Sequence, residues 1–142
     1  MSEIFVDTIR KTGGSLGTDI RIKNTSVHES DGGTSVTQNI VQGLAKHWNQ
    51  FVQSSTQTVA DSFNQSSLTD EGTGDSSWDF TNAMGNDDYS SQTTCTSGSY
   101  HFTSSYNDAQ KTTAGDRCYT MTAGSSVADA ASVFITTHGD LA

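Results

Sequence analysis

The sequence contains no proline, so every break in regular structure has to come from Gly, Asn, Asp or Ser. It also lacks an apolar run approaching the ~20 residues that a transmembrane helix needs. The N-terminal stretch MSEIFVDTIRKTGG has no basic segment followed by an apolar one, so we expect no secretory signal peptide. These absences predict a protein that is made in a cytosol and is not inserted into a membrane. It stays in the cytosol or leaves it without a secretory signal peptide.

Cationic side chains are few, because seven Lys and Arg stand against sixteen Asp and Glu, for a net charge of −9. A phosphate-binding surface needs clustered cations. The only local concentrations are Arg10 with Lys11 and Arg21 with Lys23. We therefore expect no nucleic-acid binding, and the negative charge also opposes docking on anionic membranes.

Hydrophobic residues are scarce too, at 32% of 142 residues, whereas Ser and Thr together supply 42. Two Trp, four Tyr and six Phe are nevertheless more aromatics than a disordered chain usually keeps. The length suits a single folded domain. A domain with so few apolar residues has a thin core, so burial shared between identical copies is a route to stability.

Only two cysteines are present, Cys95 and Cys118, and neither a CxxC motif nor metal-ligand spacing to the four His links them. Three interpretations remain: two small buried thiols on strands, a disulfide formed after release into an oxidising medium, or a redox or nucleophilic role. We expect the first.

Period-two alternation and enrichment in β-branched and aromatic residues predict many short strands. The fold class that follows is all-β: a small antiparallel β-sandwich-like head over residues 45–142 and an extended β arm over residues 1–44. Two stretches compete for helix. Val36, Ile40, Val41 and Leu44 form a helical stripe within 34–48, where an irregular linker is the alternative, and residues 125–132 could form one turn. The candidate strands are 3–9, 19–23, 45–52, 56–64, 66–69, 75–81, 89–97, 99–106, 117–123 and 131–139.

The stretch SSLTDEGTGDSSWDFTNAM, residues 66–84, predicts a β-hairpin. Strands 66–69 and 75–81 flank the turn DEGTG, where two glycines supply the positive φ angles that such a loop needs. Leu68, Trp78 and Phe80 can then meet on one face across the two strands. Together with Trp48 and Phe63, we expect them to be core or trimer-interface residues.

The acidic turn also raises the question of a metal site. An EF-hand that starts at Asp70 fails, because Gly72 and Gly74 occupy its third and fifth positions. An irregular calcium site stays open as the alternative. The four His show no HxH or HExxH spacing, and no GxSxG motif is present. We therefore expect no catalytic residue, no metal site and no cofactor, and hence a protein that is not an enzyme.

Residues 43–89 resemble a β domain of tailed-bacteriophage fibre proteins, whose pattern is similar to G-x-A-K-x-W-x-x-F followed by D-S-F-N-x-S-S-x-T-D-x-G-T-G-D and F-T-x-A-M. The N-terminal segment SEIFVDTIRKTGG and the C-terminal segment VFITTHGD are also similar to the corresponding segments of such virion appendage proteins. Gly85 departs from the pattern, since the family often has Pro there. The matching residues are Gly43, Ala45, Lys46, Trp48, Phe51, Asp61, Ser62, Phe63, Asn64, Ser66, Ser67, Thr69, Asp70, Gly72, Thr73, Gly74, Asp75, Phe80, Thr81, Ala83 and Met84.

The resemblance implies a homotrimeric structural virion protein, a short tail-fibre-like appendage assembled in the host cytoplasm and displayed on the virion surface. Its arm would attach to other phage structural proteins of the tail, neck or capsid. Ile4, Val6 and Ile9 are the residues that we expect to bury into that partner. Host-surface polysaccharide is a further expected ligand; its binding residues stay unknown, although the Ser- and Thr-rich stretch 90–130 is the expected recognition surface. The alternatives are a capsid, neck or collar decoration protein and a glycan depolymerase.

Overall fold

The computed structural model of the protein describes residues 27–30, 33–39, 43–97, 101–105 and 110–142. Within these ranges the chain forms ten β-strands and no α-helix, so the all-β prediction is confirmed. None of the described residues belongs to a helix long and apolar enough to cross a membrane. The predicted attachment residues Ile4, Val6 and Ile9 lie outside the described residues.

The first described strands form a hairpin in which β1 (Val27–Ser30) pairs antiparallel with β2 (Gly33–Asn39). The alternatives of a helix or an irregular linker are therefore wrong for 33–39. The predicted helix is also wrong for residues 47–48, because β3 (His47–Val52) begins there. The physical reason is local, because β-branched residues such as Val36 favour extended backbone and Gly43 is a poor helix former.

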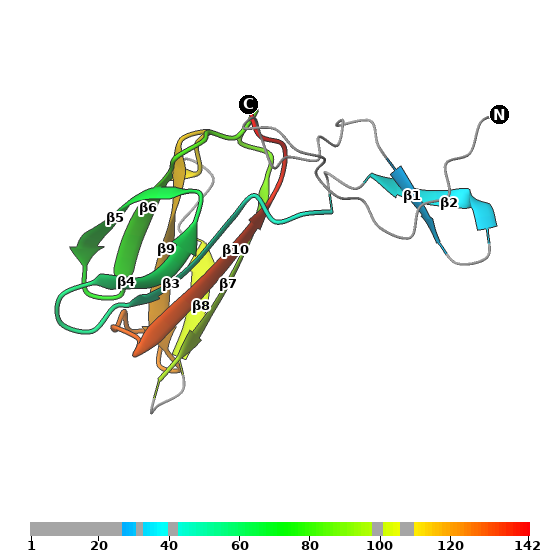
Figure 1. Ribbon diagram of the computed structural model, residues 1–142. Helices are drawn as coiled ribbons and strands as arrows, with labels where there is room; N and C mark the ends of the chain where they lie inside the picture. Colours follow the sequence, from blue (N-terminus) through cyan, green and yellow to red (C-terminus); the bar gives the residue numbers. More distant parts are fainter. Residues whose placement is uncertain (1–26, 31–32, 40–42, 98–100, 106–109) are drawn as a thin grey trace, which may run out of the picture.

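Two four-stranded antiparallel sheets make up the rest of the fold, and Figure 1 shows them packed face to face as a sandwich. The first sheet has the order β4-β3-β10-β7 and the second β5-β6-β9-β8. The remaining bounds are β4 (Thr58–Phe63), β5 (Gln65–Gly72), β6 (Asp75–Phe80), β7 (Ser90–Thr96), β8 (His101–Ser105), β9 (Gly115–Thr122) and β10 (Ser132–His138).

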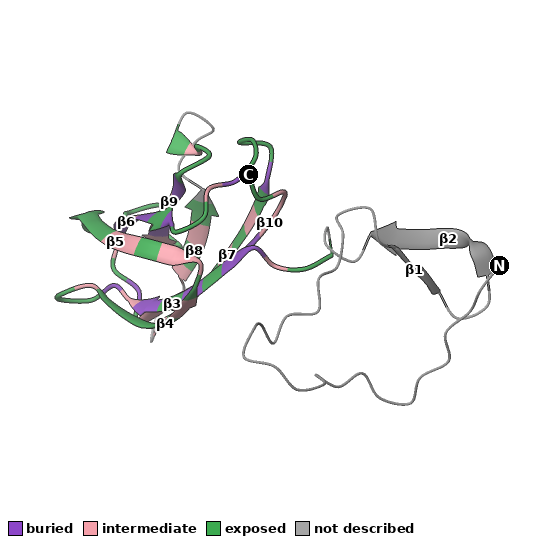
Figure 2. Cartoon of the chain, turned by 45° about the horizontal axis from the view of Figure 1, so that its top comes forward, coloured by how far each residue is buried: buried purple, intermediate pink, exposed green. Residues whose placement is uncertain are grey.

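The buried side chains of the sandwich are polar as often as they are hydrophobic, and Figure 2 shows where its buried segments lie. Among the described residues, nine buried side chains are hydrophobic and nine are polar or charged. Such an interior depends on satisfied hydrogen bonds as well as on apolar packing. The hydrophobic members are Phe51, Trp78, Phe80, Met84, Tyr89, Cys118, Ala130, Val133 and Ile135.

Between β4 and β5 the chain passes from the first sheet to the second, and the connection is one residue long, Asn64. Its φ of 57° lies in the left-handed region, which Asn tolerates better than most side chains. The Asn64 side chain holds the crossing in place: its amide donates to the Lys46 carbonyl at 2.9 Å, and its oxygen accepts from the Asn82 N–H at 2.7 Å.

The predicted hairpin is present as β5 and β6, and Leu68 lies directly opposite Trp78. Its turn is shorter than expected, because β5 extends through Gly72 and only Thr73 and Gly74 separate the strands. Gly74 combines a φ of 68° with a tight approach, since an added Cβ would lie 2.6 Å from the Thr120 carbonyl oxygen. That position therefore requires glycine.

Residues 125–132, where the sequence offered one helical turn, are not helical. Val127 forms an isolated bridge with Met121, and the Ala128 N–H donates to the Thr120 carbonyl at 3.1 Å. Pairing with β9 satisfies backbone groups that one turn of helix would leave without partners.

Candidate functional site

The three carboxylates next to the hairpin turn all have protein partners. Asp70 accepts the Gly72 N–H at 3.0 Å, and Glu71 accepts the Ser77 hydroxyl at 2.7 Å. Asp70 and Glu71 lie exposed on β5 rather than in the turn itself, whereas Asp75 is buried at the start of β6. In the described part of the chain, no three His, Cys, Asp or Glu side chains are grouped to hold a metal ion.

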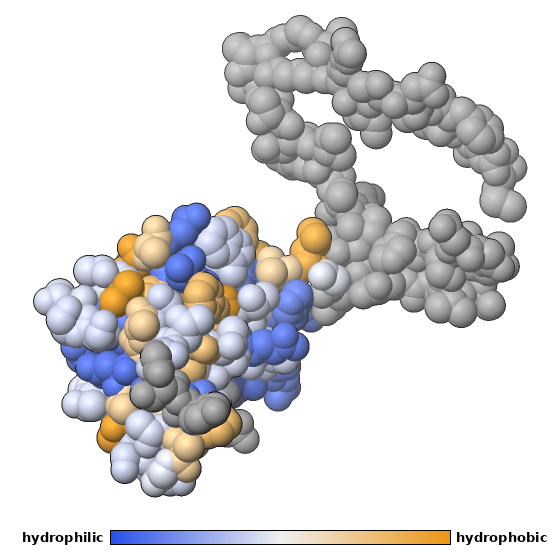
Figure 3. Space-filling view, turned by 90° about the horizontal axis from the view of Figure 1, so that it is seen from below, coloured by the Kyte–Doolittle hydropathy of each residue, from blue (hydrophilic) through white to orange (hydrophobic). Residues whose placement is uncertain are grey.

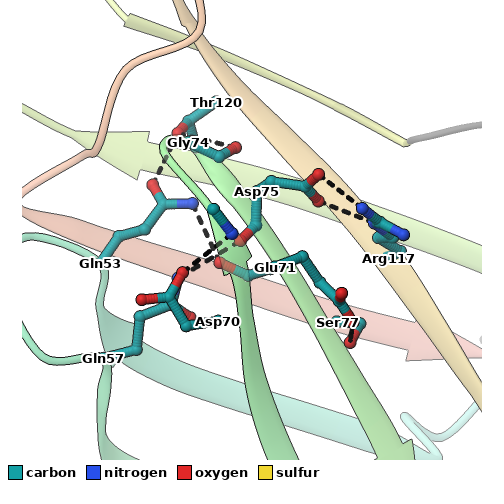
Figure 4. A network of polar contacts seen from close by, with 11 residues as sticks. Gln53, Gln57, Asp70, Glu71, Gly74, Asp75, Ser77, Arg117 and Thr120 are labelled. Carbon is teal, nitrogen blue, oxygen red and sulfur yellow. Dashed lines mark hydrogen bonds and ion pairs between the residues drawn. The ribbon is translucent and has the colours of Figure 1, made fainter.

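Asp75 forms a bidentate ion pair with Arg117 of β9, which Figure 4 shows alongside the hairpin. The Arg117 Nε and Nη2 donate to the two Asp75 oxygens at 2.7 and 2.6 Å. The two side chains are only 9% and 21% exposed. This parallel geometry is the strong form of a carboxylate–guanidinium contact, so the carboxylate of Asp75 is committed to joining β6 and β9.

Gln53, just after β3, connects the two sheets through its amide (Figure 4). Its nitrogen donates to the Ser76 hydroxyl at 3.0 Å, and its oxygen accepts the Thr120 hydroxyl at 2.6 Å and the Ala130 N–H at 2.9 Å. Gln53 is 1% exposed. A buried amide with partners on both ends fixes the spacing of the sheets and leaves no free group for a ligand.

A second network of buried polar side chains contains Asp, Ser and His, the residue types of a hydrolase triad. The Ser91 hydroxyl donates to Asp116 at 2.7 Å and lies 3.2 Å from the Thr137 hydroxyl. The Thr137 hydroxyl is 3.3 Å from Nδ1 of His47, and Nε2 of His47 is 3.4 Å from the Gln65 side-chain oxygen. Thr137 thus stands between the serine and the histidine.

This order of contacts does not activate a nucleophile, because a triad needs the histidine to take the serine proton. His47 is also completely buried, and its ring stacks on Trp78 with centroids 5.9 Å apart. Burial lowers the pKa of His47 to about 4 and raises the pKa of Asp116. We interpret this polar network as a link between the two sheets that contains an uncharged His47.

The two cysteines are free thiols on opposite sheets. Cys118 lies in the core, and Cys95 packs against it while partly buried. Burial raises the pKa of Cys118 to about 12 and also raises the pKa of Cys95. Because the thiolate is the reactive form, these surroundings oppose a nucleophilic role.

The structure divides the five predicted core or interface residues. Trp78 and Phe80 lie in the core, and Leu68 packs against it while partly buried. Trp48 and Phe63 do not lie in the core, because they are 38% and 52% exposed; the trimer interface stays the prediction for these two residues. The cause is the alternation of β3, in which His47, Asn49 and Phe51 point inward and Trp48 points outward.

Trp48 and Phe63 instead lie side by side on the outer face of the first sheet. The strand register sets Phe63, Trp48, Thr136 and Gln92 in one row across the sheet. The next row is Asp61, Gln50, Phe134 and Thr94. Residues opposite each other on neighbouring strands share a face, so we define these eight residues as the outer aromatic face.

Sequence reasoning did not locate this face, because it assigned both tryptophans alike to the core or the trimer interface. The opposite orientations of Trp48 and Phe51 were a signal, since only one of them can face inward.

In the space-filling view of Figure 3, apolar surface lies in several separate areas of the head rather than in one.

Comparison of the chain with protein-family models, with curated proteins and with solved structures finds no match.

Proposed function

We propose that the chain is a structural protein of a tailed-phage virion, a short fibre-like homotrimeric appendage that is not an enzyme. The observation that carries this proposal is the structural role of the residues on which the resemblance rests. Asn64 turns the chain between the sheets, Gly74 makes the hairpin turn, and Asp75 pairs with Arg117. A motif whose members hold a scaffold together supports a module that serves as architecture.

The acidic hairpin supports the same conclusion from the side of chemistry. A catalytic or metal-binding loop keeps carboxylates directed at its ligand. Here Asp70 and Glu71 accept hydrogen bonds from neighbours on their own hairpin, and Asp75 is bound to an arginine. The side chains of His47 and Gln53 are likewise occupied by contacts between the sheets, with Gln65 and Ser76.

Association of identical copies agrees with the composition of the sandwich. Its described residues include as many buried polar as buried hydrophobic side chains, while large aromatic side chains stay exposed on its surface. Covering those aromatics in an assembly removes apolar area from water and stabilises each copy. We propose three copies per assembly, as the resemblance implies.

In this proposal the arm, residues 1–44, attaches to a tail, neck or capsid protein through Ile4, Val6 and Ile9. The head faces outward on the virion surface, where host-surface polysaccharide is its candidate ligand. A capsid, neck or collar decoration would use the same fold, and the position on the particle separates it from a tail appendage.

Two measurements on the full chain test the proposal. Light scattering during size-exclusion chromatography should give about 45 kDa, three times the chain mass of 15.1 kDa, and a stable 15 kDa species at micromolar concentration would contradict the trimer. Gold-labelled antibody against the chain should bind intact particles of the encoding phage at the tail. Labelling of the capsid would favour the decoration alternative, and the absence of the chain from particles would refute a virion role.

A further inference from the structure

The outer aromatic face is the side of the first sheet that the sandwich leaves uncovered. Its centre is the cross-strand pair of Trp48 and Phe63, with half-buried Phe134 in the neighbouring row. Val52 on β3 continues the same side of the sheet, because residues two apart on a strand share a face. Apolar side chains from three neighbouring strands therefore adjoin one another on this side.

The outer aromatic face is also almost free of charge in a chain of net charge −9. Of its eight residues, only Asp61 carries a charge, and it lies on the edge strand β4. Its other polar members are amides and hydroxyls: Gln50, Gln92, Thr94 and Thr136. Copies with the same strong negative charge repel each other, so they can approach most closely through a face that carries little of it.

The outer face of the second sheet carries more charge, although it also holds the exposed Phe102, which lies opposite Met121 on its β8 side. There the register aligns Ser67, Asp79 and Gly115 in one row and Thr69, Ser77 and Arg117 in the next. Asp75 and its partner Arg117 lie on this side, and Glu71 binds Ser77 there. Two copies meeting through this face would bring several carboxylates together at a cost in electrostatic energy.

The two exposed aromatic side chains can form the apolar centre of an interface, and the polar residues around them have to supply the rest of its area. A fully buried aromatic side chain removes about 150–250 Å² from water, and Trp48 and Phe63 still expose 38% and 52% of their surface. A stable interface needs about 800 Å² per partner. The aromatic pair supplies the centre, and the amides and hydroxyls around it supply a rim that can form hydrogen bonds.

We propose that the outer aromatic face is the surface through which copies of this chain associate, with Trp48 and Phe63 buried at the centre of the contact. This inference rests on the proposed homotrimer and adds the location of its interface. Directed at a three-fold axis, one such face on each copy contacts both neighbours. The acidic face of the second sheet then remains on the outside of the assembly.

The test introduces a charge at the centre of the face in the full-length chain. Trp48→Glu and Phe63→Glu place a carboxylate where burial would leave it without a partner. Phe102→Glu is the matched control, because Phe102 is an aromatic residue on β8 of the other sheet that is even more exposed (59%). The readouts are mass by light scattering over a dilution series and circular dichroism for the fold.

We expect Trp48→Glu and Phe63→Glu to be folded monomers, with a dissociation constant raised at least about 100-fold, as for a central interface residue. Phe102→Glu should keep the mass of the unaltered chain. If both variants on the outer aromatic face assemble like the unaltered chain, this inference is wrong while the trimer stands. If the unaltered chain is itself a monomer, the homotrimer fails as well.

The unaltered chain provides an independent measurement, should a variant fold poorly. It has two tryptophans, of which Trp78 is 2% exposed in the single chain and Trp48 is 38% exposed. Acrylamide should quench neither in the assembly, and dilution to the monomer should make one component quenchable. Quenching of Trp48 in the intact assembly would overturn the inference, as would protection of Trp48 only on addition of a neutral polysaccharide.

Discussion

Strands β3 and β6 each carry one tryptophan and direct it to opposite sides. On β6, Trp78 and Phe80 point into the sandwich and Asp79 points to solvent. On β3 the polar residues His47 and Asn49 point inward, and Trp48 points outward. The difference teaches that side-chain hydrophobicity alone did not set the orientation of β3. Phe51 and the polar contacts of His47 and Gln53 with the second sheet fixed it instead.

The largest expected effect contrasts the two tryptophans directly. Trp78→Ala removes a fully buried ring and should lower the free energy of unfolding by about 3–5 kcal/mol. Trp48→Ala should change it by less than ~1 kcal/mol under conditions where the chain is monomeric, because its ring is already partly in water. Urea denaturation of both variants checks this difference. Equal losses for the two variants would remove the contrast between β3 and β6.

The inward histidine of β3 should make stability depend on pH. The pKa of His47 is about 4 in the folded chain, against an ordinary value of 6.5, so the unfolded chain binds more protons between those values. The stability that His47 contributes is complete above pH 6.5 and is lost as the pH falls to 4, by up to roughly 3 kcal/mol.

Denaturation curves at several pH values measure this loss, and His47→Gln should abolish most of it. The raised pKa of Asp116 acts in the opposite direction, because protonation of that buried carboxyl favours the folded state as the pH falls. A pH profile that is the same with and without His47 would show that the inward histidine of β3 does not govern acid stability.

Gln53 tests whether the polar interior next to β3 holds the sheets together. Gln53→Ala removes the partner of the buried Ala130 N–H and of the Ser76 hydroxyl, whereas the Thr120 hydroxyl keeps the Ala128 carbonyl; the change should cost about 2–3 kcal/mol. Gln57→Ala is the control, because its amide makes one long bond of 3.3 Å to the Asp75 carbonyl. Thermal melts should separate the two variants clearly, and similar melting temperatures would deny Gln53 this role.

The smallest expected effect concerns the outward polar side of β6. Asp75→Asn weakens the bidentate pair with Arg117 and should cost roughly 1–2 kcal/mol, since the pair is partly exposed. Asp79→Asn on the same strand changes only an exposed contact with Ser67 and should be nearly neutral. A double-mutant cycle with Arg117→Met isolates the pair energy, and a coupling near zero would contradict its role in joining β6 to β9.

Local patterns predicted the class of the fold and the presence of one hairpin. Alternation and turn residues are short-range signals, so a hairpin with Leu68 on the same face as Trp78 followed from residues 66–84 alone, although its turn is shorter than predicted. The helical stripe in 34–48 misled because a few apolar residues fit two periods at once. The polar networks were not predictable: Asp75 and Arg117 are 42 residues apart, and Gln53 and Thr120 are 67 apart.

The sequence by itself determined an acidic, all-β chain with the hairpin of 66–84, because composition and period-two patterning act between near neighbours. Only the tertiary structure decided which tryptophan is buried and which carboxylate is paired. Those outcomes depend on which residues of two separate sheets face each other across the interior. A shift of a strand's register by one residue exchanges its inward and outward faces. Contacts between the sheets select one of the two faces, and the inward side of β3 was selected for His47, Asn49 and Phe51.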